Sequence, residues 1–289
     1  MVYLFYDYKE FLGMECLKTE TGVKISGVKD FDLAQTLDCG QSFRWAETDN
    51  GFYGIAFDRE VVMRLEKNTL YIDNCDEKEF DSIWKDYLDL DLDYGKIREE
   101  LSELHPILKE AGEYASGIRI LRQEPWEALC TFIISQNNNI KRIKGIVARL
   151  CESFGEKVGS GYTFPRAETL AKLEPDDLAP LRAGFRNKYI IDAAQKVASG
   201  EVNLEICRTL PYDEARAELM KIKGVGVKVA DCALLFGMHR IEAFPVDVWM
   251  KRALEKLFPD MIPSDFGEYA GIAQQYIFHY SRMHPELFA

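Results

Sequence analysis

The chain has 289 residues, 47% of them hydrophobic, which is enough for two or three packed subdomains. No apolar run reaches the length of a membrane span, and the first ten residues lack the basic and then apolar pattern of a signal peptide, so we expect a cytoplasmic protein, nucleoid-associated if it is bacterial. The net charge of −12, taken alone, argues against binding nucleic acid, because affinity for phosphates comes from Lys and Arg.

Short aromatic and β-branched segments separated by turn residues dominate the first part of the chain. They predict an antiparallel sheet with strands at 43–45, 52–57, 61–65 and 69–73. Two stretches with helical spacing follow, at 77–88 and 92–104. We therefore expect residues 1–117 to form an α+β domain.

From residue 118 onward the apolar residues recur at a spacing of three to four, which is typical of helices packed on a core. Gly, Pro or Asn residues separate the predicted helices, which span 125–135, 140–154, 167–172, 186–199, 212–222, 229–237, 247–258 and 266–283. The glycine-rich stretch 155–164 is expected to be a mobile loop. Residues 118–289 are therefore predicted to form a second, all-α domain.

Charge is distributed unevenly along the chain. Acidic residues concentrate between residues 76 and 113, whereas basic residues cluster at 141–144, 182–188 and 221–228. If the acidic residues lie on one surface and the basic clusters on a separate, DNA-binding surface, a net negative charge is compatible with binding to DNA.

The segment 223–228, Lys-Gly-Val-Gly-Val-Lys, lies between two predicted helices. Gly224 and Gly226 allow a tight turn with positive φ and a bare backbone. The free N–H groups and the dipole at the start of the next helix could then receive a DNA phosphate without net positive charge. A plain glycine turn between packed helices would give the same pattern.

Lys228 and Asp247 are the candidate catalytic pair. Lys228 stands at the start of an apolar helix, where the dipole disfavours an ammonium ion and so favours the neutral amine that a nucleophile needs. Asp247 directly precedes another helix, so it is well placed as its N-cap. A carboxylate in the same cleft could accept a proton from Lys228 and stabilise a positively charged sugar. A surface lysine and a purely capping aspartate would give the same sequence.

The hairpin, the lysine and Pro-Val-Asp, in this order, resemble the helix-hairpin-helix DNA glycosylases with a Gly-Pro-Asp type loop. Six segments narrow the resemblance to the 8-oxoguanine DNA glycosylase/lyase family: Asp38-Cys-Gly-Gln-Ser-Phe-Arg-Trp45, Leu121-Arg-Gln-Glu-Pro125, Asn137-Asn-Asn-Ile140, Ala183-Gly-Phe-Arg186, Lys228-Val-Ala-Asp-Cys232 and Tyr269-Ala-Gly-Ile-Ala-Gln274. They cover essentially the whole chain. The resemblance implies an N-terminal sheet domain followed by an all-α helix-hairpin-helix catalytic domain.

The resemblance implies a bifunctional enzyme that excises 8-oxoguanine from DNA and then nicks the strand. Lys228 would form a Schiff base with the sugar, and Asp247 would be the essential carboxylate. Gly40 would present a backbone carbonyl to the base. Oxidation at C8 turns guanine N7 from an acceptor into an N–H donor, so a fixed carbonyl favours the damaged base.

Four further residues would form the base pocket. Cys232 and Phe278 would sandwich the extruded base, and Gln274 would read its Watson–Crick edge. Gln274 and Phe278 are four residues apart and therefore share a helix face. Trp249 stands where the animal enzymes carry His, so it can pack and donate one hydrogen bond but cannot bridge to a phosphate as a cation.

The remaining DNA contacts follow from the same resemblance. Asn137 would fill the hole left by the flipped base, and Arg142 and Arg186 would hold the orphaned partner base, cytosine. Phe185 would wedge beside that partner. Because Phe185 lacks the hydroxyl of the Tyr in the animal enzymes, it leaves opposite-base selectivity open, as does Trp249.

The sequence also constrains cofactors. Its seven scattered cysteines form no C-x-x-C pair, and none follows Cys232, so we expect no iron–sulfur cluster. We expect no required cofactor, although the backbone carbonyls of Met220, Ile222 and Val225 are candidate ligands for a structural monovalent cation or calcium ion at the hairpin.

The expected partner is duplex DNA containing 8-oxoguanine opposite cytosine, acted on by a monomer with no membrane contact. Two alternatives stay open. One is a monofunctional alkylpurine glycosylase, in which Lys228 would be idle. The other is a non-catalytic helix-hairpin-helix DNA-binding module.

Overall fold

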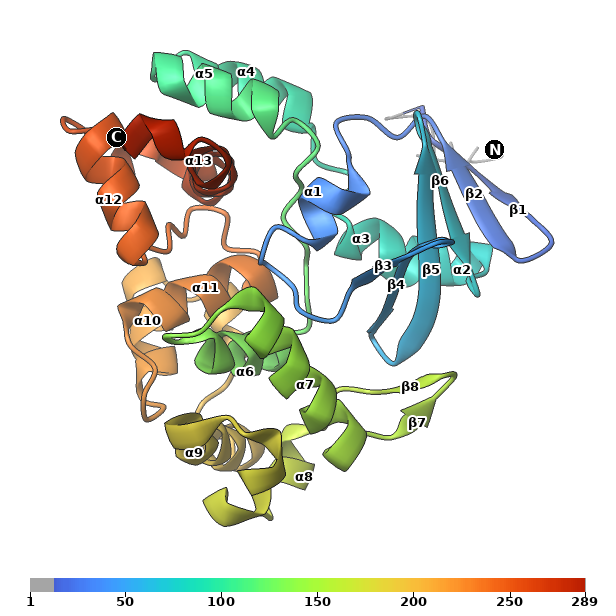
Figure 1. The fold of residues 1–289 in the computed structure, drawn as a ribbon, viewed down its shortest axis with the longest axis vertical. Coiled ribbons are helices and arrows are strands. Elements are labelled where there is room, and N and C mark those ends of the chain that lie inside the picture. Colours follow the sequence, from blue (N-terminus) through green and yellow to red (C-terminus); the bar gives the residue numbers. More distant parts are fainter. Residues whose placement is uncertain (1–12, 289) are drawn as a thin grey trace, which may run out of the picture.

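The computed structural model describes residues 13–288 and has two parts, a six-stranded antiparallel sheet with short helices and a larger group of helices (Figure 1). The α+β class with a helical second part is confirmed. Residues 1–12 and 289 of the two predicted domains lie outside the described residues, and so does the segment on which the expectation about a signal peptide rests. Within residues 13–288, no helix is long and apolar enough to cross a membrane.

The strands of the sheet follow the order β1-β2-β6-β5-β4-β3. Their bounds are β1 (Glu15–Lys18), β2 (Gly22–Ser26), β3 (Ala46–Thr48), β4 (Gly51–Ala56), β5 (Arg59–Glu66) and β6 (Thr69–Asp73). The predicted strands at 52–57, 61–65 and 69–73 are confirmed as β4, β5 and β6. Strands β1 and β2 were not predicted, although Val23 and Ile25 alternate with the half-buried Lys24 as in a strand with one buried face.

Residues 43–45 do not form the predicted strand, because their aromatic rings serve two different cores. Phe43 is buried in the helical core, whereas Trp45 is buried in the core under the sheet. The Trp45 indole N–H donates a hydrogen bond to the Tyr87 hydroxyl at 2.7 Å. This segment therefore fastens the two parts of the molecule together.

Short helices cover one face of the sheet. They are α1 (Leu33–Leu37), α2 (Glu77–Glu79), the π-helical turn η2 (Phe80–Trp84) and α3 (Lys85–Tyr87). The last three form the predicted helix at 77–88, which Asp76 and Glu79 open with a reciprocal capping box. Phe80 and Trp84 from the π-helical turn are both buried in the sheet core.

The second part consists of helices around one continuous core. They are α4 (Tyr94–Ser102), α5 (Pro106–Tyr114), α6 (Pro125–Ser135), α7 (Ile140–Phe154), α8 (Ala167–Leu170), η3 (Pro175–Leu181), η4 (Gly184–Arg186), α9 (Asn187–Ala198), η5 (Ile206–Arg208), α10 (Tyr212–Met220), α11 (Val227–Met238), α12 (Val248–Leu257), η6 (Pro263–Tyr269), α13 (Ala270–Met283) and η7 (Pro285–Phe288). Helices α4 and α5 bury Tyr94 and Leu108 in this core rather than under the sheet. Helices α6 and α11 are buried along most of their length at its centre.

Two segments of the second part differ from the simplest prediction. Residues 155–164, expected to be a mobile loop, contain a short hairpin of β7 (Lys157–Val158) and β8 (Gly161–Tyr162), which lies beside the sheet (Figure 1). The Ser160 N–H donates to the Glu60 carboxylate on β5 at 2.7 Å, which holds the hairpin in place. The predicted helix at 266–283 is broken at Gly267, whose φ of +69° interrupts the helical backbone before α13 begins.

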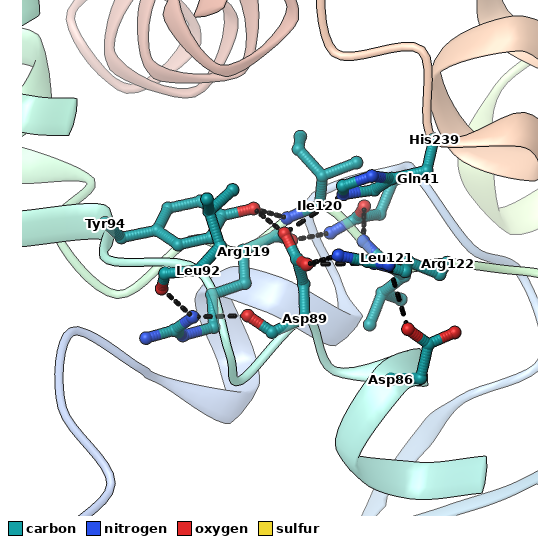
Figure 2. Close-up of polar contacts among 10 residues, drawn as sticks. All are labelled: Gln41, Asp86, Asp89, Leu92, Tyr94, Arg119, Ile120, Leu121, Arg122 and His239. Carbon is teal, nitrogen blue, oxygen red and sulfur yellow. Dashed lines mark hydrogen bonds and ion pairs between the residues drawn. The ribbon is translucent and has the colours of Figure 1, made fainter. Parts of the chain in front are cut away.

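A buried polar network joins the two parts (Figure 2). The Asp89 side chain, which follows α3, accepts hydrogen bonds from Arg122 at 2.6 and 2.9 Å and from the Tyr94 hydroxyl at 2.8 Å. Arg119 donates to the backbone carbonyls of Asp89 and Leu92. The chain that connects the two parts is therefore fixed by side chains on both sides of it.

Candidate active site

The hairpin between α10 and α11 depends on its glycines for different reasons. Gly224 has a φ of +82°, and a Cβ there would lie 2.5 Å from the Tyr189 ring, so both the backbone and the available space require glycine. Gly226 is the N-cap of α11 with a φ of −98°, and a Cβ there would meet nothing within 4 Å. The predicted positive φ is therefore confirmed at Gly224 and wrong at Gly226. Val227 at the start of α11 is half exposed, so this helix end is open to solvent.

Lys228 is the second residue of α11 and points against α6. Its Nζ lies 3.4 Å from the Ser135 Oγ and 5.4 Å from the centroid of the Phe132 ring. The Ser135 hydroxyl donates to the Phe132 carbonyl at 2.8 Å, so it offers its lone pair to Lys228. One hydrogen-bond acceptor and an aromatic face thus hold the amine of a half-buried side chain.

Asp247 is the N-cap of α12, as predicted. Its Oδ1 accepts the N–H of Met250 at 2.7 Å, which fixes the carboxylate at the helix start. Its Oδ2 makes no hydrogen bond with any residue among 13–288, and the side chain is half-buried. Capping of the helix therefore leaves one carboxylate oxygen of Asp247 available to interact with a bound ligand.

A cavity of about 540 Å³ brings the predicted groups together. Its lining includes all seven residues expected to act on the sugar or the base: Gly40, Lys228, Cys232, Asp247, Trp249, Gln274 and Phe278. The volume is typical of pockets that enclose a small organic group, roughly 300–1,000 Å³. The convergence of these side chains is a finding, whereas their individual roles stay predictions.

Gly40 owes its identity to the backbone rather than to crowding. Its φ is +99°, which L side chains rarely adopt, while a Cβ there would reach only ordinary contact with the Ile140 Cδ1, at 3.5 Å. The segment around it is held by Gln41, whose side chain donates to the Thr36 and Arg119 carbonyls and accepts the Leu121 N–H. A rigid backbone therefore enters the cavity wall from the sheet part.

The cavity wall combines polar and apolar side chains. Burial raises the pKa of Cys232 to about 11, despite the opposing charge of Lys228, so this residue meets the cavity as a neutral thiol. The Phe278 ring is covered on one side by the Arg282 guanidinium, 5.3 Å from its centroid. The only N–H of the Trp249 side chain is donated to the Ser281 hydroxyl at 2.8 Å. Trp249 thus packs as predicted and uses its one donor inside the protein.

The residues expected to contact DNA form a separate group beyond the cavity lining. Asn137 is exposed with a φ of +46°, Phe185 is 49% exposed, and Arg142 is exposed. Arg186 is only 2% exposed and donates to the carbonyls of Gln136, Asn137 and Ala183. Burial and the neighbouring charge of Arg142 lower its pKa. In this structure Arg186 therefore supports the loop that carries Asn137.

Several residues of the site were missed from the sequence. Ser135 and Phe132 hold Lys228, while Cys39, Gln275 and Arg282 line the cavity. Gln275 and Arg282 had an available signal, because they lie on the same predicted helix as Gln274 and Phe278, and so did Cys39, which directly precedes Gly40. The others belong to apolar or turn segments whose role depends on which helix packs against them.

The hairpin carbonyls named as cation ligands are near other donors. The Ile222 carbonyl accepts the Val225 N–H at 3.0 Å, and the Lys196 ammonium donates to the neighbouring Lys221 carbonyl at 2.5 Å. A carbonyl that accepts one hydrogen bond retains a second lone pair, so the Ile222 oxygen is compatible with a cation. In the part of the chain that the structure describes, no cluster of His, Cys, Asp and Glu could hold a metal.

Comparison with known proteins matches this architecture to one family. The model of the 8-oxoguanine DNA glycosylase N-terminal domain matches residues 24–129, and that of the HhH-GPD superfamily base excision DNA repair proteins matches residues 130–261. The Arabidopsis thaliana N-glycosylase/DNA lyase OGG1 is 30% identical over 86% of this chain and 77% of its own. The chain belongs to the 8-oxoguanine DNA glycosylase/lyase family.

Other members of the 8-oxoguanine DNA glycosylase/lyase family are also similar to this chain in sequence and structure. The Clostridium acetobutylicum 8-oxoguanine glycosylase/lyase, in complex with duplex DNA containing cytosine opposite 8-oxoguanine, is 39% identical with a TM-score of 0.88 and covers 94% of this chain and 98% of its own. The Saccharomyces cerevisiae N-glycosylase/DNA lyase is 41% identical over 48% of this chain, a match that spans 42% of that protein. Membership in the family favours an enzyme over the non-catalytic module that the sequence left open.

The two family models meet inside α6, whereas the sequence predicted a division after residue 117, and that boundary stays a prediction. The cavity draws on both sides of either division. Gly40 comes from the sheet part, and Lys228 and Asp247 come from the helical part. The cavity of this chain is therefore complete only when the two parts are packed together.

Proposed function

We propose that this chain excises 8-oxoguanine from duplex DNA, opposite cytosine, and then cleaves the strand through a Schiff base on Lys228. The observation that carries the proposal is the single cavity in which Lys228 and Asp247 meet the Gly40 backbone and the Gln274 amide. Its size suits one extruded base, and an enzyme that acts on a base must take it out of the stack.

In the proposed first step the Lys228 amine attacks the sugar C1′ while the bond between C1′ and the base breaks. The base leaves with the electron pair of that bond and takes up a proton. The carboxylate of Asp247 stabilises the positive charge that develops on the sugar, and its Oδ2 is the oxygen that capping leaves available. The Gly40 carbonyl accepts the N7–H that only the oxidised base offers.

In the second step the amine bound to C1′ becomes an imine as the sugar ring opens. The imine acidifies the C2′ hydrogen, so loss of that proton expels the 3′ phosphate and nicks the strand 3′ to the lesion. Hydrolysis of the imine returns Lys228. The step requires an amine nucleophile on the enzyme, which is why Lys228 separates a lyase from a monofunctional glycosylase.

Borohydride trapping tests this proposal directly. An 8-oxoguanine duplex should form a covalent adduct with the wild-type protein, and Lys228→Gln should form none. Lys172→Gln, which changes an exposed lysine outside the hairpin and the basic clusters, is the control and should trap normally. Release of methylated purines without any adduct, or an adduct in Lys228→Gln, would contradict the proposal.

We also propose that the hairpin carbonyls of Met220, Ile222 and Val225 hold a monovalent cation or calcium ion that is shared with a DNA phosphate. The compatible Ile222 oxygen supports this. Binding of an undamaged duplex should then change when potassium is replaced by lithium at constant ionic strength, and equal affinities would argue against the cation. We further propose a cytoplasmic location, associated with the nucleoid if the protein is bacterial, and fractionation of cells expressing the chain tests it.

A further inference from the structure

Two consecutive glutamines on α13 line the same cavity. Gln274 and Gln275 are each 5% exposed, and both belong to the cavity wall. Neighbouring residues of a helix point about 100° apart, so they rarely serve one site in the same way. Gln274 is the residue that the family resemblance assigns to the base edge, and Gln275 has no role so far.

The two side chains are hydrogen-bonded to each other inside the wall. The Gln275 Nε2 donates to the Gln274 Oε1 at 2.7 Å, and the Cys39 thiol lies 3.6 Å from the Gln275 Oε1. Burial raises the pKa of Cys39 to about 11, so its sulfur keeps the proton that it donates. A chain of hydrogen bonds, which we call the relay, therefore links Cys39 in the sheet part through Gln275 to Gln274.

The relay determines which end of the Gln274 amide is available. Its oxygen is engaged by Gln275, whereas its Nε2 makes no hydrogen bond with any residue among 13–288. An amide presents an acceptor at one end and two donors at the other. With its oxygen held, Gln274 offers donors to the cavity, and the matching atom on the Watson–Crick edge of a guanine is the O6 acceptor.

If only the Gln274 amide rotated by 180°, its Nε2 would face the Nε2 of Gln275, and buried N–H groups would have no acceptor. Both amides would have to turn together. Gln275 would then direct its N–H groups at the Cys39 sulfur, which is a weak acceptor. The thiol has another acceptor in the Thr36 carbonyl at 3.4 Å, so the alternative is costly but not forbidden.

We propose that Gln275 is a positioning residue for base recognition: held by Cys39 and bonded to Gln274, it fixes which end of the Gln274 amide faces the extruded base. This inference rests on the proposed function, because it assumes that the cavity takes the base. It predicts that Gln275 controls selectivity without touching the base itself. The functional group it selects is O6, rather than the N2 amine.

The test compares 8-oxoguanine with 8-oxohypoxanthine, which keeps O6 and N1–H but lacks the N2 amine. We expect the wild-type protein to bind and excise the two with similar kcat/KM. Gln275→Glu offers only acceptors, so it should turn the Gln274 amide and present its oxygen to the N1–H and N2 amine. Preference for 8-oxoguanine should then rise about threefold to tenfold, the value of one added hydrogen bond.

A double-mutant cycle keeps the inference testable where a buried carboxylate impairs folding. Gln274→Met, Gln275→Met and the double variant keep the volume and remove the hydrogen bonds, and thermal unfolding confirms that each is folded. If Gln275 acts through Gln274, the loss of kcat/KM in the double variant equals the loss in Gln274→Met alone. Cys39→Ala should give a smaller loss in the same direction as Gln275→Met.

The outcomes separate this inference from the proposed function. Absence of base release by the wild-type protein would refute the function, and the binding ratio of the two duplexes, measured in the Lys228→Gln background, would still test the relay. Additive losses in the cycle, or an unchanged base preference in folded Gln275→Glu, would overturn the relay while leaving the excision activity in place.

Discussion

Asp89 Oδ2 lies 3.1 Å from the Nε2 of His239, and this hydrogen bond ties the sheet part to the far end of the helix that begins with Val227 and Lys228 (Figure 2). His239 ends α11 in the left-handed conformation, with a φ of +53°. The Asp89 side chain is completely buried. A charge in the sheet part thus holds the C-terminal cap of the helix that presents the proposed nucleophile.

Asp89→Asn should destabilise the fold, because it keeps the shape and removes the charge that His239 and Arg122 share. We expect a loss of about 3 kcal/mol in the free energy of unfolding, the usual effect of removing one partner from a buried pair. Urea unfolding at pH 7 measures it. Asp86→Asn is the matched control: Asp86 also binds Arg122 but is 66% exposed, so its loss should stay below about 1 kcal/mol.

The contribution of Asp89 should disappear in acid. Burial would raise the pKa of Asp89, but the hydrogen bond and charge of His239, followed by Arg122 and Tyr94, outweigh it and hold the pKa below the ordinary value of 3.8. A carboxyl group whose pKa is lowered by folding stabilises the fold at any pH above its ordinary pKa. That stability is lost as the pH falls through the lowered pKa of the folded state. The difference between the wild-type protein and Asp89→Asn should therefore shrink only below about pH 4. A constant difference down to pH 2 would refute this.

Glu124 should have the opposite dependence. Burial raises its pKa to about 7, with help from the charges of Glu127 and Asp58. A carboxyl group whose pKa is raised by folding makes its full contribution to stability at any pH below its ordinary pKa. That contribution is lost as the pH rises through the raised pKa of about 7. Between pH 5 and pH 8, Glu124→Gln should gain about 2 kcal/mol of stability relative to the wild-type protein, and the exposed control Glu168→Gln should gain none. Unfolding curves at the two pH values decide it.

The two hairpin glycines should separate folding from DNA binding. Gly226→Ala adds a methyl group to open space at the start of α11, so the melting temperature should hardly change while affinity for an undamaged duplex falls. Gly224→Ala forces a φ of +82° on alanine and drives its Cβ against Tyr189, so stability should fall by at least about 1–2 kcal/mol. A stable Gly224→Ala, or full DNA affinity in Gly226→Ala, would contradict these assignments.

Asp247 should likewise show two separable effects. Asparagine is as good an N-cap as aspartate, so Asp247→Asn should keep the stability of α12 and the affinity for DNA but lose base excision. Asp247→Ala should lose excision and, in addition, about 1 kcal/mol of stability. Single-turnover excision and thermal unfolding of both variants provide the comparison. Normal turnover in Asp247→Asn would remove this carboxylate from the chemistry.

The sequence predicted the groups that motifs mark. Lys228 after its glycine turn and Asp247 before its helix are local patterns, and both lie where the patterns indicated. Gln274 and Phe278, four residues apart, face one cavity as their spacing required. Local rules succeed here because each of these positions is determined by its own helix.

The parts that could not be predicted depend on packing between distant segments. Nothing in the sequence places Ser135 beside Lys228, because that contact exists only where α6 lies against α11. Burial of Arg186 under the Asn137 loop and attachment of the β7–β8 hairpin to Glu60 have the same origin. Residues 43–45 were misassigned because Phe43 and Trp45, which are buried in two different cores, alternate with Arg44 as buried residues alternate in a strand.

The straddling position of Phe43 and Trp45 limits how this protein can be rebuilt. They follow Gly40 within five residues, so the stretch that supplies a cavity wall is anchored at once in both hydrophobic cores. The helical part therefore cannot be grafted onto another sheet, or trimmed to a minimal catalyst, without reshaping the wall that faces the base. An exchange of domains between relatives would have to transfer the segment with Phe43 and Trp45 together with both hydrophobic cores.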